Sequence, residues 1–205
     1  MPRLEFVAEK VYWTACFACV IGARSSMEYV LRKATLDDRP ALESLIARSA
    51  RGLSANDYHP EQVEGALRGA FGVDTQLIAD ETYFVVALDG KIVGCGGWSY
   101  RRTLFGGDHR AERDSATLDP GVDSAKIRAF FVDPDHARKG IGSRLLEHCE
   151  TQARLRGFSR LELMSTLPGV RLYAARGYVP TGQVRYEVGA GVAIEFIPML
   201  KEIPK

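Results

Sequence analysis

A short basic loop with two glycines, ARKGIG at residues 137–142, is the stretch of this chain with the clearest chemistry. It follows an apolar run that predicts a strand over 127–132, and it precedes a sequence with helical periodicity. The first amide N–H groups of a helix have no partners within it, and the helix dipole adds partial positive charge there. Glycine lets an anion approach the backbone closely, and Arg138 and Lys139 add full charges. The pattern therefore predicts an anion cradle, most simply for a pyrophosphate.

Two other phosphate-binding loops do not match this stretch. A P-loop requires G-x-x-x-x-G-K-[ST], but Gly142 is followed by Ser143 and Arg144. A dinucleotide fingerprint requires a third glycine after Gly-x-Gly, and Leu145 stands in that position. A glycine turn that joins a strand to a helix and binds no ligand is the structural alternative.

The strand end, the loop and the helix together resemble motif A of the GNAT family, the acetyl-CoA-dependent N-acetyltransferases. In that family Q/R-x-x-G-x-G/A follows a strand that ends V-x-P. Val132 and Pro134 match the strand end, Gly140 and Gly142 match the loop, and Ala137 departs from the first motif position. The resemblance implies that acetyl-CoA binds here, with its pantetheine arm between the splayed fourth and fifth strands. The residues that it implicates are Phe130, Phe131, Val132, Arg138, Lys139, Gly140, Ile141, Gly142 and Ser143.

A second block, RLELMSTLPGVRLYAARGY at residues 160–178, resembles motif B of the same family, roughly L-E-V…N…A…L-Y-x-x-x-G-F/Y. Glu162 lies in the strand part of the motif, and Tyr173 and Gly177 lie in the helix part. The asparagine usual in the family is absent. In many members the motif tyrosine lies near the thiol and acts as a general acid, which the resemblance implies for Tyr173. The alternative is an aromatic side chain that only packs on the sheet.

The general base is less well defined. Some family members carry a glutamate eleven residues before the first position of motif A, where this chain has Lys126. Others use the glutamate of the L-E-V strand, which corresponds to Glu162 and makes it the first candidate. A strand charge that points outward is the alternative for Glu162. Asp133 and an ordered water are the fallback candidates.

The remaining elements fit a single α/β domain with a mixed, mostly antiparallel sheet, splayed central strands and flanking helices, as the resemblance over residues 28–200 implies. The pattern divides the chain into an N-terminal extension, 1–26, outside the core fold, and a GNAT-like domain over 27–205. Strands are predicted at 28–34, 82–88, 91–100, 127–132, 161–164, 183–188 and 192–199. Helices are predicted from Thr35, after Pro60 through 70, from the glycine loop, and from 169 to Gly177, with a loop over 50–58.

Two segments are candidates for the acceptor side. In this family the first two helices and their loop flank the acceptor site, so Tyr58 and His59 are candidates for substrate contact, although a surface turn is the favoured interpretation. Residues 101–125 form a polar insertion that is long for a loop between two strands, which is typical of lids and binding loops. His109 lies within it, most simply as a solvated side chain.

Composition excludes several classes of protein. The 205 residues include 27 basic and 26 acidic ones, so there is no broad charge for binding nucleic acid or an anionic membrane. No apolar run approaches the ~18 residues of a membrane helix. The four cysteines are too few and scattered for a disulfide scaffold, which favours a cytoplasmic protein. Cys16-x-x-Cys19 has no second ligand pair, so no metal is expected, and Cys95 is expected as a small buried filler.

The expected function is direct transfer of an acetyl group from acetyl-CoA to a primary amine of a small molecule or a protein. The alternative is a non-catalytic acyl-CoA-binding sensor or interaction protein with the same fold. Homodimers are plausible for this family, but no feature of the sequence decides the oligomeric state.

Overall fold

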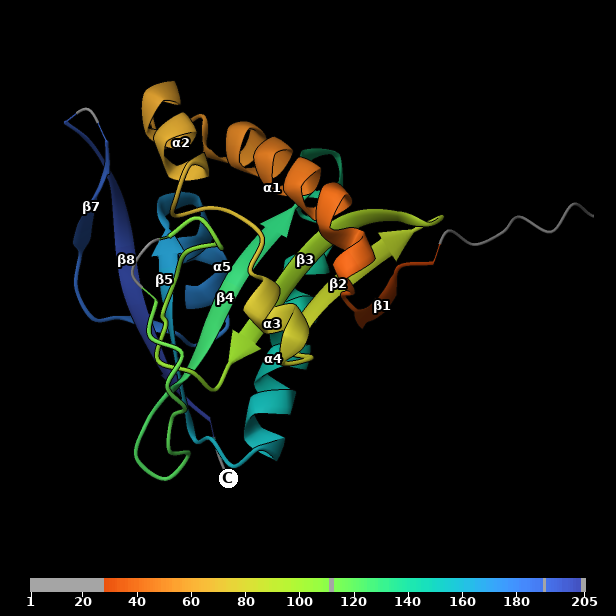
Figure 1. Ribbon diagram of the computed structural model, residues 1–205, viewed down its shortest axis with the longest axis vertical. Helices are drawn as coiled ribbons and strands as arrows, with labels where there is room; N and C mark the ends of the chain where they lie inside the picture. The colour runs from red at the N-terminus through yellow and green to blue at the C-terminus, as the bar shows by residue number, and fades with distance from the viewer. Residues whose placement is uncertain (1–27, 111–112, 190, 204–205) are drawn as a thin grey trace, which may run out of the picture.

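Helices cover both faces of one eight-stranded sheet (Figure 1). The computed structural model describes residues 28–110, 113–189 and 191–203, so the predicted extension 1–26 lies outside the described residues. The strands are β1 (Val30–Lys33), β2 (Tyr83–Leu88), β3 (Lys91–Ser99), β4 (Ala125–Val132), β5 (Arg160–Thr166), β6 (Val179–Pro180), β7 (Val184–Gly189) and β8 (Val192–Glu202). The helices are α1 (Arg39–Ser54), α2 (Pro60–Leu67), α3 (Thr75–Ala79), α4 (Ile141–Leu155) and α5 (Val170–Ala174).

The sheet order is β1-β2-β3-β4-β5-β8-β6, with β7 paired to β8. Within the described sheet, β4 and β5 are the one parallel pair of neighbours. Their pairing runs from Ala125↔Leu161 to Ile127↔Leu163 and then stops, so the later parts of both strands separate. The predicted mixed, mostly antiparallel sheet with splayed central strands is therefore confirmed.

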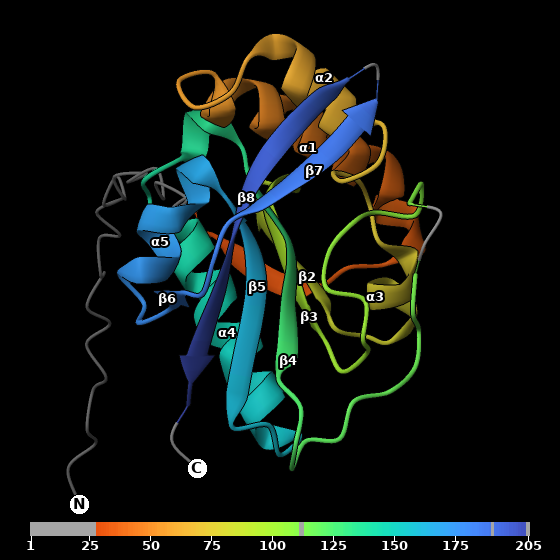
Figure 2. The same ribbon diagram turned by 90° about the vertical axis from the view of Figure 1, so that its left-hand side faces the viewer.

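Each face of the sheet has its own hydrophobic core. Helices α1, α2 and α3 cover one face, and α4 and α5 cover the other (Figure 2). Helix α4 shows why: its buried side chains follow an i, i+4, i+5, i+8, i+12 pattern, on one side of the helix, at Ile141, Leu145, Leu146, Cys149 and Ala153. The cavity described below lies where β4 and β5 separate between these two layers.

A bulge in β4 determines which side chains face the gap. Gly97 pairs with Arg128 and Cys95 with Phe131, so two β4 residues stand opposite Gly96. One of them, Ala129, has a φ of 56°. A Cβ atom on Gly96 would lie 2.7 Å from the ring of Phe130, so only glycine leaves room for that ring. The extra residue shifts the alternation of β4 side chains just where the strand leaves β5.

Several boundaries differ from the predicted ones. Helix α1 continues to Ser54, so the predicted loop 50–58 begins later, and α2 ends at Leu67. Helix α3 and strand β6 were not predicted, because five and two residues are too short to show a periodic pattern.

Among the described residues, no helix is long and apolar enough to cross a membrane. Within those same ranges, no group of three or more His, Cys, Asp and Glu side chains is placed to hold a metal ion. The predicted Cys16-x-x-Cys19 pattern falls outside them.

Candidate active site

A cavity of about 820 Å³ opens where β4 and β5 separate. At one end it is bounded by the start of α4 and by α5. The end of α1, residues 70–72 after α2, and residues 104–106 of the insertion line it from the other face of the sheet. Residues 127–132 of β4 line the space between. One continuous cavity therefore joins the predicted anion cradle to the predicted acceptor side.

The loop before α4 has the backbone of an anion cradle. Arg138 and Gly140 have φ values of 63° and 83°, a conformation that turns successive N–H groups toward one side. The helix ladder begins with the bond from the Arg144 N–H to the Gly140 carbonyl, 3.0 Å long. The N–H groups of residues 141–143 precede that bond and have no acceptor within the helix. They are therefore available to a phosphate in the cavity.

Gly142 lies in the cradle, close to α5. A Cβ atom there would lie 3.1 Å from Cδ2 of Leu172 on α5. A larger side chain would therefore fill the space between α4 and α5.

Eight of the nine predicted cofactor residues line the cavity, and Lys139 does not. The Lys139 Nζ is exposed and donates to the Asp135 carbonyl over 2.9 Å. Arg171, which the sequence analysis did not single out, lines the same end of the cavity as Arg138. Its position two residues before the motif tyrosine was the available signal.

One β4 amide is already bonded within the protein. The Val132 N–H donates to Oγ of Ser49 on α1, 3.1 Å away, and both residues line the cavity. Ser49 was missed because nothing in a helical sequence marks a serine that reaches a strand far away in the chain.

Tyr173 lies on α5 and its side chain lines the cavity. Its ring meets Phe130 edge to face at a centroid distance of 6.3 Å. Burial raises its pKa above the ordinary value for tyrosine, so the phenol carries its proton at neutral pH. The structure thus gives the residue both a packing role and access to the cavity.

Glu162 forms an ion pair with Lys126 across the paired part of β4 and β5. It is two residues from Met164 and shares a strand face with it, but Met164 lines the cavity and Glu162 does not. Burial lowers the pKa of Lys126, although the nearby Asp123 raises it in part. The carboxylate is therefore near the cavity and partly neutralised.

Asp133, the fallback base, is buried just after β4. Burial raises its pKa, but hydrogen bonds from Arg48, at 2.9 Å, and from the Asp135 N–H outweigh this and leave the pKa below its ordinary value. It does not line the cavity. In the described chain, Asp133 caps the turn that leads into the cradle.

The Acetyltransferase (GNAT) family model matches residues 51–178, a segment that contains the cradle, Glu162 and Tyr173. The chain belongs to this family. Solved structures agree on the fold of this GNAT protein. A GCN5-related N-acetyltransferase from Rhodopseudomonas palustris is 21% identical, with a TM-score of 0.63 over 85% of this chain and 96% of that one.

Two further structures with the same fold are N-acetyltransferases. PaiA from Thermoplasma acidophilum, solved in complex with coenzyme A, is 16% identical, with a TM-score of 0.57 over 86% of this chain and 99% of that one. The ribosomal-protein-S18-alanine N-acetyltransferase from Escherichia coli is 19% identical, with a TM-score of 0.55 over 87% and 96% of the two chains. At these identities the likeness concerns the fold.

Tyr58 holds the loop between α1 and α2 of this GNAT fold in place. Its side chain does not line the cavity. The Tyr58 hydroxyl donates to the Glu195 carbonyl over 2.5 Å and accepts from the Leu167 N–H over 2.8 Å. Burial raises its pKa to about 12. His59 is the N-cap of α2 and lies at the surface, outside the cavity lining. Tyr58 therefore ties three segments together. The favoured interpretation of both residues as a surface turn agrees with the exposure of His59 but is wrong for Tyr58, whose ring is buried in the core.

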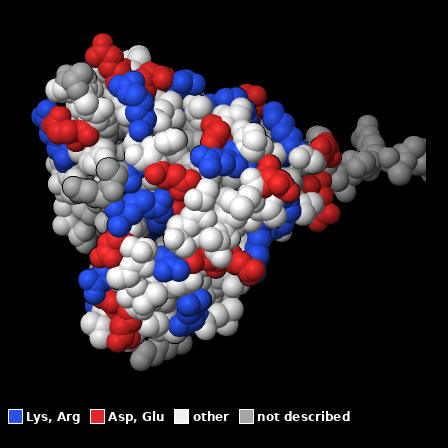
Figure 3. Space-filling model, in the orientation of Figure 1, with Lys and Arg blue, Asp and Glu red and all other residues white. Residues whose placement is uncertain are grey.

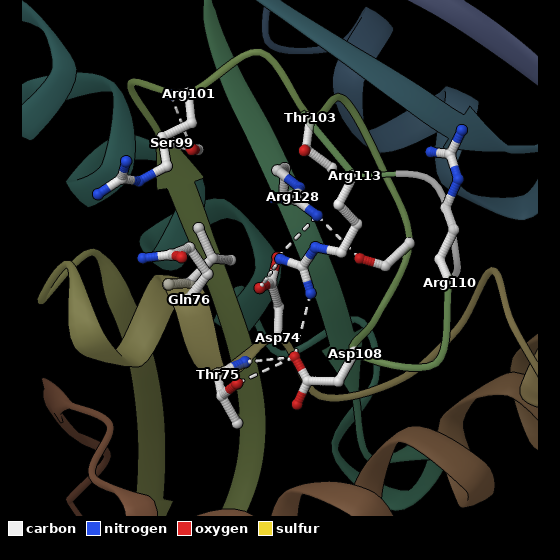
Figure 4. Close-up of polar contacts among 12 residues, drawn as sticks. Asp74, Thr75, Gln76, Ser99, Arg101, Thr103, Asp108, Arg110, Arg113 and Arg128 are labelled. Atoms are coloured by element: carbon white, nitrogen blue, oxygen red, sulfur yellow. Dashed lines mark hydrogen bonds and ion pairs between the residues drawn. The ribbon is translucent and has the colours of Figure 1, made fainter. Parts of the chain in front are cut away.

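The insertion is fastened to α3 and β4 by charged side chains (Figure 4). Arg113 pairs with the fully buried Asp74 and, at 3.1 Å, with Asp108. Asp108 also accepts from both the N–H and the hydroxyl of Thr75, each at 3.0 Å. This network holds residues 104–106 against the cavity. His109 of the same segment is exposed, as expected.

Basic and acidic side chains are interspersed on the face shown in Figure 3, with no large area of one sign. This face therefore carries no broad electrostatic footprint for a polyanion.

Proposed function

We propose that acetyl-CoA binds along the cavity and that its acetyl group is transferred directly to a primary amine that enters from the opposite end. The observation that carries this proposal is the continuity of the cavity from the α4 cradle, through the gap between β4 and β5, to the insertion. The pyrophosphate is assigned to the loop and first turn at 138–143, where Arg138 and free N–H groups favour negative charge. The pantetheine arm is assigned to residues 130–132.

The amine nitrogen attacks the thioester carbonyl, a C–N bond forms, and the C–S bond breaks. The nitrogen loses a proton to a base or water, and the departing thiolate takes one. Tyr173 is the proposed donor of that proton because its protonated phenol lines the cavity. Burial in the cavity raises the free energy of a thiolate as well as that of a phenolate. The raised pKa of the phenol therefore disfavours proton transfer from Tyr173 to the thiolate less than it would in water.

The proposed base is Glu162 or an ordered water. No Asp, Glu or His lies among the described residues that line the cavity, so no carboxylate touches the acceptor directly. Glu162 is the nearest candidate along β5, two residues from the cavity-lining Met164. In this proposal, an ordered water between the acceptor amine and Glu162 carries the proton to this carboxylate.

The same absence of cavity carboxylates favours a second candidate, a protein that binds acyl-CoA without catalysis. It shares the cradle and the cofactor. A panel of amines assayed for thiol release separates the two, because only the enzyme releases coenzyme A in proportion to acceptor.

Calorimetric titration with acetyl-CoA tests the binding site. The Gly142→Glu variant places bulk and negative charge against Leu172, so we expect wild-type binding and its loss in the variant. Gly182→Glu is the matched control, because Gly182 is exposed and lies outside the cavity. If wild-type protein does not bind acetyl-CoA, the proposed function is wrong. If Gly142→Glu binds it as tightly as wild type, the cofactor does not bind at the loop before α4.

A further inference from the structure

The acceptor end of the cavity combines aromatic walls with one buried cation. Phe71, Phe105 and Phe196 line it, and the ring of Phe196 is 6.1 Å from that of Phe71 and 5.6 Å from that of Phe105. Arg128 lines the same region from β4. The cavity-lining charges among the described residues are arginines alone: Arg128, Arg138 and Arg171. A polycationic acceptor would find no carboxylate there.

The Arg128 guanidinium is buried, with 2% of its side chain exposed. Its Nη2 donates to the Gly106 carbonyl over 2.8 Å and lies 2.7 Å from Oδ2 of Asp74, an ion pair without hydrogen-bond geometry (Figure 4). Its Nε is buried and has no hydrogen-bond partner in the described protein. A buried donor without an acceptor is costly, and a bound ligand can supply the missing acceptor.

The described charged side chains around Arg128 include one more cation than anions. Two aspartates, Asp74 and Asp108, face Arg128 and Arg113 in the network that fastens the insertion. Arg110 stacks on Phe105, with its guanidinium carbon 4.2 Å from the ring centroid. Among the described residues, this region therefore holds three arginines and two aspartates. Burial lowers the pKa of Arg128 to about 10, which still leaves the guanidinium charged at neutral pH.

We propose that the acceptor is a primary amine that also carries a carboxylate and an apolar or aromatic side chain, as a hydrophobic amino acid does. The carboxylate accepts from the unpaired Nε–H of Arg128, and the side chain packs among Phe71, Phe105 and Phe196. A guanidinium N–H donates a strong, charge-assisted hydrogen bond to a carboxylate, and the three aromatic side chains supply the apolar contact. This assignment rests on the proposed function, because it names the acceptor of that same site.

The first test compares L-phenylalanine with L-phenylalaninamide and phenethylamine as acceptors, with spermidine as a polycation. Thiol release is measured at several concentrations to obtain kcat/KM. We expect phenylalanine to be the best acceptor and spermidine to be inactive. The three amines differ in basicity, so the decisive quantity is how the ratio of phenylalanine to phenylalaninamide changes between wild type and variants.

Arg128→Gln should reduce that ratio by at least about tenfold, mainly through KM for phenylalanine, because the charged hydrogen bond is lost. Arg128→Lys should restore part of it. Arg39→Gln is the matched control: it removes an exposed arginine that pairs with Glu43 and does not line the cavity. It should leave the ratio unchanged. An unchanged ratio in Arg128→Gln would overturn the proposal.

A wild-type experiment covers the case in which Arg128→Gln does not fold. 3-Phenylpropionate lacks the amine, so we expect it to bind the complex with coenzyme A in calorimetry, whereas the neutral 3-phenylpropionamide does not. Equal binding of the two, or binding of neither, would overturn the proposal. Acetyl-CoA that fails to bind would refute the proposed function itself, whereas acetyl-CoA binding with a preference for phenylalaninamide or spermidine would refute only the assigned acceptor.

Discussion

At the scale of single residues, the cavity has a proton donor but no adjacent proton acceptor among its described lining. Tyr173 is the one phenol of the described lining, and the proposed base, Glu162, is paired with Lys126. Acetyl transfer needs both a leaving-group proton and a neutral amine. The proton donor and the proton acceptor can therefore be tested separately.

Replacing Tyr173 with Phe should lower kcat by about 10²- to 10⁴-fold, the usual contribution of general acid catalysis. The acetyl-CoA Kd should stay near wild type, since the ring is retained. Tyr178→Phe is the control, because Tyr178 packs on Tyr173 at 5.8 Å but does not line the cavity.

The pH profile gives a second check on Tyr173. Its pKa is raised by burial, so the phenol stays protonated until the pH rises above its ordinary value of about 10. We expect no loss of turnover from its deprotonation between about pH 7 and 9. A fall in that range that disappears in Tyr173→Phe would contradict the assignment.

Glu162→Gln should lower turnover and leave acetyl-CoA affinity nearly unchanged if Glu162 is the base. Lys126→Gln separates this role from a structural one, because it removes the ion pair but keeps the carboxylate. The base hypothesis predicts that Lys126→Gln stays active. Wild-type turnover in Glu162→Gln would exclude Glu162 and leave water as the base.

At the scale of elements, the insertion between β3 and β4 acts as a wall of the cavity. Many of its anchors are polar: Asp108 alone accepts hydrogen bonds from Thr75 and Arg113. Segments with few apolar contacts and many polar anchors open more readily than a core. The stability of this wall is therefore separable from that of the sheet.

Asp108→Ala should loosen the insertion and cost about 1–3 kcal/mol, as expected for lost hydrogen bonds to a charged group. Hydrogen exchange of residues 102–110 should accelerate while exchange in β2 and β3 stays slow. Asp57→Ala, in an exposed turn before α2, is the control. Uniform acceleration across the sheet would show that the insertion does not open separately.

At the scale of the whole molecule, the described residues 28–110, 113–189 and 191–203 form both cores and line the cavity. Both cores are built from residues of the predicted domain, 27–205. The extension 1–26 is thus predicted to be dispensable for the fold.

Deleting residues 1–26 should leave thermal unfolding and acetyl-CoA binding unchanged. Calorimetry and a melting curve of the shortened protein, beside the full chain, measure both. A truncated protein that is insoluble or does not bind acetyl-CoA would show that the extension contributes to the domain.

The sequence by itself indicated the family and the cradle, because strand, glycine loop and helix start are contiguous in the chain. The resemblance to that family then implied the sheet with its splayed strands. Local order is enough to identify such a motif. Only the tertiary structure brought in Ser49, Arg128 and the insertion network, since these contacts join residues far apart in sequence. It also paired Glu162 with Lys126. Such a pair depends on which strands are neighbours in the sheet and on their register. The sequence pattern of one strand does not specify which strand lies beside it.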